Sequence, residues 1–145
     1  MNETIKKFGY PATLLREYDH WVVLLRPAQV TLGSLVLAAK SDATAIEALP
    51  PEAYAELQTV TAAIAQALSG TIQHQKINYL LFMMIDPHVH FHALPRYEGE
   101  RTACGVTIAD TAWPGVPDIS QAHKLNDAER DALRDWLKPY FTQGQ

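Results

Sequence analysis

The sequence predicts an α+β domain in which a mostly antiparallel five-stranded sheet carries one long helix and a C-terminal helix. Three patterns predict this class: short apolar runs bounded by turn residues, a long stripe of residues at helical spacing, and a second helical pattern near the end. The expected strands span residues 14–18, 21–25, 34–38, 77–85 and 88–94. Short connections between successive strands favour antiparallel pairing.

The first two strands are recognised by their apolar content and by the residues between them. Leu14–Tyr18 and Trp21–Leu25 flank an Asp-His pair that favours a turn, so we expect a hairpin. Every residue of Trp21–Leu25 is apolar, as expected for a buried strand. Pro27 interrupts this pattern before the third strand begins.

The long helix is predicted to begin at Pro50 and Pro51, because proline followed by an early acid favours the first turn of a helix. Its stripe at helical spacing comprises Tyr54, Leu57, Thr61, Ile64 and Leu68. We expect this stripe to pack in the core. Gly70 stands where a C-terminal cap is expected.

The C-terminal helix is predicted from a capping pair. Asn126 and Glu129 have the spacing at which each side chain can bond to the backbone N–H of the other. Apolar residues continue the pattern at Leu133, Trp136 and Leu137. Pro139 lacks a backbone N–H and is expected to end or kink the helix.

Composition places the chain among ordinary globular proteins. Its 145 residues predict a single domain over 1–145, and 48% apolar with 19% charged residues exclude a disordered chain. A net charge of -4 weighs against a surface built to bind nucleic acid, so we expect no nucleic-acid partner. Cys104 is the only cysteine, which excludes an internal disulfide and a four-cysteine zinc cage.

The sequence shows neither an export signal nor a membrane segment. The first residues lack the apolar core of a signal peptide. The longest apolar run, Tyr79–Ile85, is too short to span a bilayer. We therefore expect a cytoplasmic protein with no membrane partner.

The chemistry-bearing segment is an alternating run of histidines. His88, His90 and His92 make up half of the six histidines in the chain. Side chains of a strand alternate between its faces, so the three rings are expected on one face, with Val89 and Phe91 on the other. Successive rings would lie roughly 6.5–7 Å apart, which is the scale of a phosphate group with its flanking oxygens.

Three interpretations of this histidine face stay open from spacing alone. A neutral imidazole can attack phosphorus near neutral pH, and neighbouring rings can stabilise charge on the phosphate oxygens. Alternating histidines are also suitable metal ligands. A purely structural role is less favoured, because burying three polar rings costs free energy unless each ring has a partner. Spacing alone favours phosphoryl chemistry and metal binding about equally.

The segment His88–Leu94 reads His-Val-His-Phe-His-Ala-Leu and resembles the motif that names the histidine triad (HIT) family, with no departure in its seven positions. The Pro-Arg-Tyr that follows is similar to members of the branch that hydrolyses dinucleoside polyphosphates. The order of the expected strands and helix upstream is also similar. The resemblance covers a triad core of about residues 14–97 and leaves 98–145 as a C-terminal extension.

The resemblance implies a HIT-like α+β fold that forms a two-fold homodimer and cleaves at the α-phosphate of a nucleotide derivative. It implies that the middle histidine, His90, is the nucleophile that forms a nucleotidyl-histidine intermediate. Water or another acceptor then releases the nucleotide. It further implies that His92 contacts the same phosphate and helps to neutralise its charge, while His88 orients the nucleophile's ring. This chemistry requires no metal and no cofactor.

The sequence also departs from the family pattern around the motif. Lys40 and Ser41 stand where many members carry a fourth histidine, and Asp86 and Pro87 stand in place of a Gly-Gln-Ser/Thr loop. Met84 stands where many relatives have asparagine, whose hydrogen bonds methionine cannot replace. These differences leave the nucleophile in place and bear on the substrate and on the catalytic rate.

Polar residues ahead of the third strand are candidates to compensate. Arg26 offers a forked guanidinium donor for phosphate. Gln29 and Thr31 face the same way if their segment is extended. We therefore predict that Arg26, Gln29 and Thr31, together with His88 and His92, bind the substrate phosphate.

The sequence thus predicts a dimeric nucleotide hydrolase that acts on diadenosine polyphosphates or nucleotide conjugates. Three alternatives stay open beside it. They are a nucleotide-binding protein with weak or no turnover, a nucleotidyl transferase or phosphorylase, and a metal site on the same histidines. The nucleobase and the leaving group cannot be read from the sequence.

Overall fold

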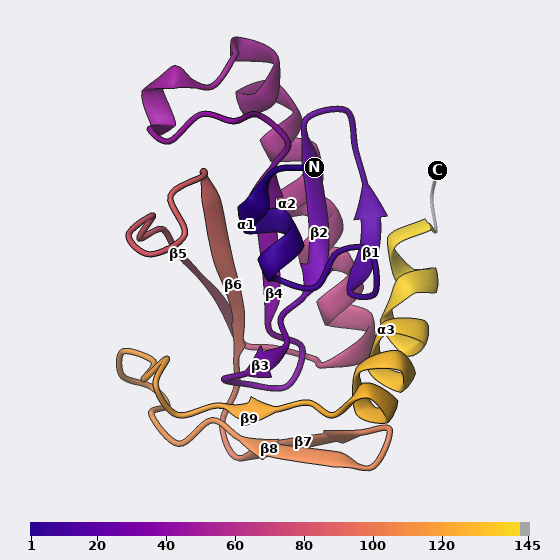
Figure 1. Cartoon of the computed structure of the whole chain (residues 1–145). Coiled ribbons are helices and arrows are strands. Elements are labelled where there is room, and N and C mark those ends of the chain that lie inside the picture. Colours follow the sequence, from indigo (N-terminus) through magenta and orange to yellow (C-terminus); the bar gives the residue numbers. More distant parts are fainter. Residues whose placement is uncertain (143–145) are drawn as a thin grey trace.

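The computed structural model describes residues 1–142, which are built around a five-stranded antiparallel sheet (Figure 1). The strands of this sheet are β1 (Leu14–Glu17), β2 (Trp21–Leu25), β4 (Leu35–Ala39), β5 (Lys76–Leu80) and β6 (His90–Arg96). They lie in the order β1-β2-β4-β6-β5, and each neighbouring pair is antiparallel. The predicted α+β class and antiparallel sheet are confirmed.

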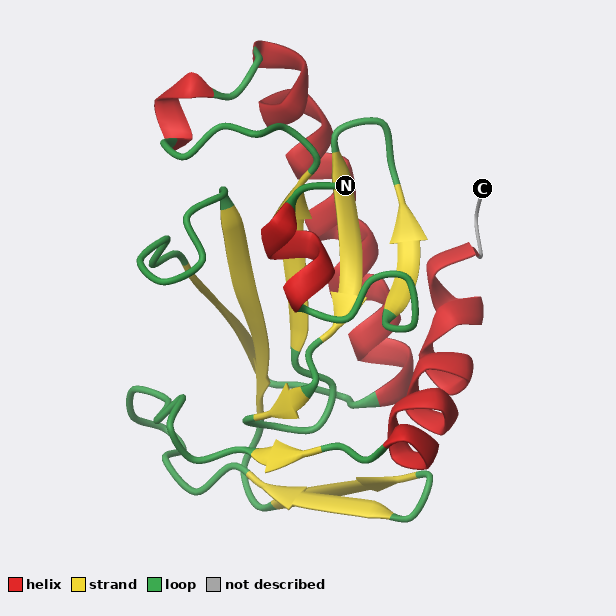
Figure 2. Ribbon diagram, viewed as in Figure 1, coloured by secondary structure: helices red, strands yellow, loops and turns green. Residues whose placement is uncertain are grey.

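Helices cover both faces of this sheet (Figure 2). They are α1 (Glu3–Lys7), the short 3₁₀ helix η1 (Ile46–Ala48), α2 (Pro51–Thr71) and α3 (Asp127–Thr142). The long α2 and the C-terminal α3 pack against each other on one face, and α1 lies across the other. The sequence predicted α2 and α3 but not α1. Within residues 1–142, the helices lack the combined length and apolar character that a membrane crossing needs.

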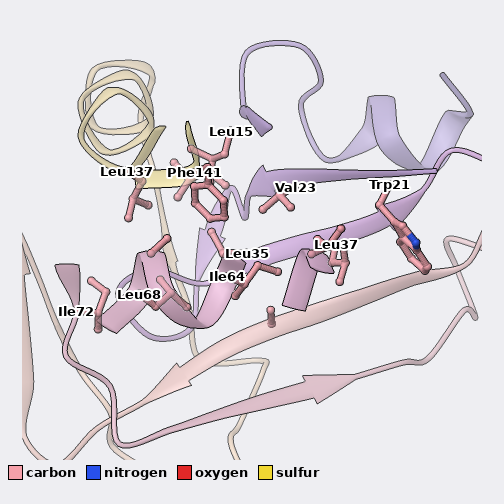
Figure 3. Close-up of a cluster of buried hydrophobic side chains, with 14 of the residues drawn as sticks. Leu15, Trp21, Val23, Leu35, Leu37, Ile64, Leu68, Ile72, Leu137 and Phe141 are labelled. Atoms are coloured by element: carbon pink, nitrogen blue, oxygen red, sulfur yellow. The ribbon is translucent and has the colours of Figure 1, made fainter. Parts of the chain in front are cut away.

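Burial on both faces explains why the central strands are apolar at every position. In β2, Trp21, Val23 and Leu25 belong to the main core, which includes residues of α2 and α3 (Figure 3). Val22 and Leu24 of the same strand join a second cluster with α1. The strand β4 alternates in the same way. Neither face of these strands meets water, so no polar residue is required between the apolar ones.

The buried face of α2 agrees only in part with the predicted stripe. Ile64 and Leu68 are buried, whereas Tyr54 is exposed. The helix continues past Gly70, so the prediction that this glycine is the C-terminal cap was wrong. A Cβ at Gly70 would lie 3.2 Å from the ring of Tyr140 in α3. Glycine at this position therefore lets the two helices approach closely.

The predicted capping pair at the start of α3 is confirmed. Oδ1 of Asn126 accepts a hydrogen bond from the backbone N–H of Glu129 at 2.8 Å, and Oε1 of Glu129 accepts one from the N–H of Asn126 at 3.0 Å. Pro139 does not end the helix, which continues to Thr142. Leu137 and Phe141 are buried on either side of the proline, and their packing keeps the last turn helical.

The main error among the predicted elements lies just before the histidine motif. The strand expected at 77–85 ends at Leu80, and the strand expected at 88–94 begins only at His90. Residues 81–89 form a loop in which Met84 and Ile85 are exposed. Apolar composition does not by itself distinguish a buried strand from an apolar loop.

The extension after residue 98 adds small sheets that the sequence did not predict. A hairpin joins β7 (Glu100–Ala103) to β8 (Val106–Ala109), and β9 (His123–Lys124) pairs with β3 (Ala28–Gln29). The hairpin turn ends at Gly105, whose φ of 78° suits glycine. Buried and exposed residues alternate along β8, which is the signal that could have predicted it. Residues of this hairpin join the main core.

Candidate active site

The strand that carries the motif presents two histidines to the face that α1 covers. His90 and His92 pair with Ala38 and Val36 of β4, which belong to the cluster with α1. Residues opposite each other in an antiparallel pair project to the same side. Both rings therefore lie beneath α1, and the intervening Phe91 packs against the main core. The predicted common face holds for these two histidines.

His90 is held by a hydrogen bond to the backbone of the motif itself. The residue is 2% exposed, and its Nδ1 lies 2.7 Å from the carbonyl oxygen of His88. A carbonyl can only accept, so in the neutral ring Nδ1 carries the proton and Nε2 keeps a free lone pair. This is the form of imidazole that attacks an electrophilic phosphorus.

His92 adopts the opposite tautomer because a cation donates to it. Nε of Arg26 donates to Nδ1 of His92 at 3.2 Å, so the proton of the neutral ring resides on Nε2. Burial, with smaller contributions from Arg26 and His90, lowers the pKa of His92 to about 4. Asp86 opposes this shift in part, and with a pKa of about 4 His92 is a neutral N–H donor at pH 7. Arg26 is the positively charged group beside this ring.

Aromatic contacts fix the planes of the two rings. The ring centroids of His90 and His92 are 5.1 Å apart, with an interplanar angle of 79°. Phe8, which follows α1, packs against both, with its centroid 5.4 Å from that of His90 and 5.7 Å from that of His92. Phe82 adds a contact at 6.2 Å from His92. The pair is thus enclosed by apolar rings on a buried strand.

His88 stands apart from the other two histidines. It precedes β6, and its Nδ1 lies 2.8 Å from the hydroxyl oxygen of Thr4 in α1. His88 lies outside the paired strand, which begins only at His90, yet its ring is bonded to α1, the helix that covers the face of His90 and His92. His88 contacts the ring of His90 through its backbone carbonyl, while its own ring is bonded to α1.

Helix α1 supplies site residues that sequence reasoning missed. Thr4 contacts His88, and Lys7 forms an ion pair with Asp86 at an N–O distance of 2.7 Å. The sequence does carry a local signal for this helix: an Asn at the cap, an acid in the first turn and lysines in the last. No local pattern indicates that the helix packs on the histidines, because these contacts join distant parts of the chain.

Of the predicted phosphate-binding residues before β4, the structure brings Arg26 to the histidines. Gln29 is fully buried, and its Nε2 donates to the carbonyls of Arg26 and Ser34 at 2.6 and 2.9 Å. Its Oε1 accepts from the N–H of Gly33 at 2.8 Å. Thr31 is also buried, with its hydroxyl 3.3 Å from that of Ser34. The prediction for Gln29 and Thr31 assumed an extended segment, but the chain turns here. The described hydrogen bonds of both side chains hold this turn.

A cavity of about 280 Å³ opens beside His90 and His92. Its other walls come from the loop before the motif and from the C-terminal extension: Phe82, Met83, Met84, Ile85, Asp86 and Ile119. Most of these side chains are apolar, and Asp86 is the charged member of the lining. The ring of His90, whose Nε2 keeps its lone pair, thus borders an open space.

A buried ion pair fixes the far end of β6. Nε and Nη2 of Arg96 donate to the two carboxylate oxygens of Asp110 at 2.7 and 3.1 Å. Nη1 of Arg96 donates to Oδ1 of Asn78 in β5 at 2.8 Å. Both charged side chains are buried. The strand that bears the histidines is thereby joined to its neighbour and to the residue after β8.

The described residues offer little to a metal ion. Within residues 1–142, His, Cys, Asp and Glu side chains do not converge in any group of three or more that could hold one. His90 and His92 are in contact, whereas the ring of His88 is bonded to Thr4. Among residues 1–142, the three motif histidines therefore do not form a group of three metal ligands.

Comparisons with known proteins bear on the fold. No family model matches the sequence, and no curated protein does either. A solved histidine triad protein from Marinobacter aquaeolei VT8 is similar, with a TM-score of 0.71 at 22% identity over 90% of this chain and 88% of that one. A histidine triad (HIT) protein from Sinorhizobium meliloti 1021 has a TM-score of 0.71 at 20% identity over 100% of this chain and 96% of that one.

A third solved structure is a zinc-bound histidine triad family protein from Mycobacterium smegmatis. It has a TM-score of 0.63 at 19% identity, over 96% of this chain and 90% of that one. Similarity at such identities is a statement about backbone architecture rather than chemistry. The chain therefore has the fold of histidine triad proteins.

Proposed function

We propose that this chain is a member of the histidine triad family and a nucleotide hydrolase that cleaves at the α-phosphate through a nucleotidyl-His90 intermediate. The observation that carries the proposal is the hydrogen bond of 2.7 Å from Nδ1 of His90 to the carbonyl of His88. It leaves Nε2 as the nucleophilic nitrogen of a ring that borders the cavity. The substrates are nucleoside phosphate derivatives, either diadenosine polyphosphates or nucleotide conjugates.

The reaction takes two displacements at phosphorus. In the first, Nε2 of His90 forms a bond to the α-phosphorus, and the leaving group departs with the electron pair of the broken bond and takes up a proton from solvent. In the second, water attacks the same phosphorus and loses a proton. The N–P bond then breaks, its electron pair returns to Nε2, and the nucleotide is released with His90 neutral again.

Two neighbouring groups stabilise the negative charge on the phosphate oxygens. Arg26 supplies the positive charge, and its guanidinium is suited to phosphate. His92 supplies the N–H on Nε2, since its Nδ1 is occupied by Arg26. In this proposal Gln29 and Thr31 contribute indirectly, by holding the loop that places Arg26.

The test is a screen of nucleotide derivatives for AMP or GMP release, with His90→Ala run in parallel. We expect His90→Ala to fold normally and to lose several orders of magnitude in turnover, as for other covalent catalysts. We expect His92→Ala to be milder. Near-normal release by His90→Ala on the preferred substrate would contradict the assigned role.

Trapping tests the intermediate directly. The protein is mixed with labelled substrate and quenched rapidly, and peptides are examined by mass spectrometry for a nucleotidyl group on His90. Adding phosphate or another acceptor, which competes with water for the intermediate, reveals whether the protein also acts as a phosphorylase or transferase. Stoichiometric zinc, iron or copper in protein purified without an affinity tag would overturn this mechanism.

A nucleotide-binding protein without turnover is the second candidate. It is favoured by one observation: the loop before the motif carries the exposed apolar residues Met84 and Ile85 in place of groups that would hold a leaving phosphate. Saturable nucleotide binding with neither product nor label on His90 would support this candidate against the hydrolase.

We also propose that the protein is a homodimer. The strand β5 is an edge of the five-stranded sheet, so one side of its backbone is free to pair with a second copy. A groove of about 570 Å³ runs between β5 and residues 113–117 of the extension. Light scattering coupled to size exclusion should give twice the chain mass, and introducing proline at Tyr79 in β5 should give a monomer.

A further inference from the structure

The loop before the histidine motif exposes large apolar side chains to solvent. Phe82 is 49% exposed, Met84 is 82% exposed and Ile85 is 86% exposed. Single exposed apolar residues are common on protein surfaces, whereas a contiguous group is typical of a binding surface. All three belong to the lining of the cavity beside His90 and His92.

The charge in this lining is already neutralised. Asp86 is its charged residue, and the carboxylate is paired with Nζ of Lys7 at 2.7 Å. A polyphosphate chain carries several negative charges and is normally held by cationic side chains or by oriented N–H groups. The side chains that line this cavity supply no free cation to hold such a chain.

The geometry points to a subsite for an uncharged, apolar substituent on the α-phosphorus, of aryl or short-alkyl size. This inference rests on the proposed function, because it places that substituent on the phosphorus attacked by His90. It narrows the substrates to nucleotide conjugates with an apolar leaving group, in preference to dinucleoside polyphosphates. Met84 and Ile85 contact the substituent, and Phe82 borders it where it meets His92.

The size of the cavity agrees with this assignment. Pockets for whole small-molecule ligands range over about 300–1,000 Å³. The cavity here is about 280 Å³, near the lower end of that range, which gives room for an aryl or short-alkyl group. Its apolar walls stabilise such a group by removing apolar surface from water.

The reaction balances in the same way as for any substrate of the proposed hydrolase. For an aryl ester of a nucleotide, Nε2 of His90 bonds to phosphorus and the P–O bond to the aryl group breaks. The phenolate leaves with the electron pair of that bond and takes up a proton from solvent. Water then releases the nucleotide from His90.

Two aryl esters and one phosphoanhydride test the preference, each with the nucleobase that the screen selects. One carries 4-methylphenol, one carries 4-hydroxybenzoate through its phenolic oxygen, and the third is the matching dinucleoside triphosphate. We expect kcat/KM for the methylphenyl ester to exceed that for the carboxyphenyl ester at least tenfold. The intrinsic reactivity of the two aryl esters has the opposite order, because the carboxylate-bearing phenol is the better leaving group.

Variants connect this preference to the loop. The double variant Met84→Gln with Ile85→Gln should reduce kcat/KM for the methylphenyl ester about tenfold and leave the other two substrates within about twofold. Met84→Leu with Ile85→Leu should keep the wild-type preference. Ile46→Gln changes another exposed isoleucine, in η1 and outside the cavity, and should leave all three rates unchanged.

The outcomes separate this inference from the proposed function. Equal or faster turnover of the carboxyphenyl ester or of the dinucleoside triphosphate, with His90 still labelled, overturns the apolar subsite and leaves the hydrolase intact. The glutamine variant could instead lose kcat/KM equally on all three substrates and change its oligomeric mass. That result assigns the loop to a subunit contact and also overturns the subsite. Absence of both product and label with all three substrates removes the hydrolase and the subsite together.

Discussion

The hydroxyl oxygen of Thr4 lies 2.8 Å from Nδ1 of His88, across 84 positions of sequence. This contact joins the N-terminal helix to the residue whose carbonyl orients the ring of His90. Thr4 is buried and His88 is half-buried, so the hydrogen bond is partly shielded from water. The orientation of the His90 ring is therefore connected to the docking of α1.

Replacing Thr4 with valine should lower kcat on the preferred substrate by about two- to tenfold, the equivalent of one ordinary hydrogen bond of about 0.5–1.5 kcal/mol. Valine keeps the shape and the packing of α1 but removes the hydroxyl. Thr4→Ser keeps the hydroxyl and should restore kcat. Steady-state kinetics and thermal melts together make the test, and a loss in Thr4→Ser equal to that in Thr4→Val would exclude the positioning role.

Removing the cation beside His92 should raise the pKa of that ring. Burial is the main cause of its lowered pKa of about 4, and Arg26 is the second cause. In Arg26→Met the His92 pKa should therefore rise only part of the way toward 6.5. Histidine ring signals followed by NMR across pH 3–8 would show this shift. An unchanged pKa would mean that Arg26 does not contact His92 in solution.

The stability of the protein should fall between pH 6.5 and pH 4 through His92. The unfolded chain takes up a proton on this ring near pH 6.5, and the folded protein does so only near pH 4. Within that window the unfolded state binds more protons, so stability decreases as pH falls. The contribution of His92 is present in full above pH 6.5 and amounts to about 1–3 kcal/mol.

A histidine-to-phenylalanine change isolates this contribution. Urea unfolding of wild type and His92→Phe at several pH values gives the two stability curves. Other groups titrate in both proteins, so the difference between the curves reports on His92 alone. That difference should change by about 1–3 kcal/mol across the window. A constant difference would show that the folded pKa of His92 is not lowered.

Breaking the buried pair of Arg96 and Asp110 should destabilise the fold strongly. Asp110→Ala leaves a buried guanidinium without its carboxylate and should cost about 3–5 kcal/mol. Replacing both partners, as in Arg96→Met with Asp110→Leu, should recover much of that loss. Lys6→Ala, which removes an exposed ion pair with Glu3, should cost less than about 1 kcal/mol. Urea midpoints of the variants test the order, and similar costs for Asp110→Ala and Lys6→Ala would contradict it.

Local patterns predicted the parts of the fold that depend on nearby residues. The capping pair of Asn126 and Glu129 formed because each partner lies within one helical turn of the other. The run Trp21–Leu25 became a buried strand because its apolar residues serve both faces of the sheet. Ile85 shows the limit of the same reasoning, since an apolar residue in an apolar run is exposed in a loop.

The sequence by itself determined that His90 and His92 project to one side, because alternation along a strand is a property of the local backbone. Only the tertiary structure decided that Arg26 donates to His92, that Thr4 holds His88 and that Phe8 covers both strand histidines. These contacts arise where α1 and the loop before β4 pack against β6. Such packing requires contact between segments that are distant in the sequence. The residue pattern within one segment carries no information about that contact.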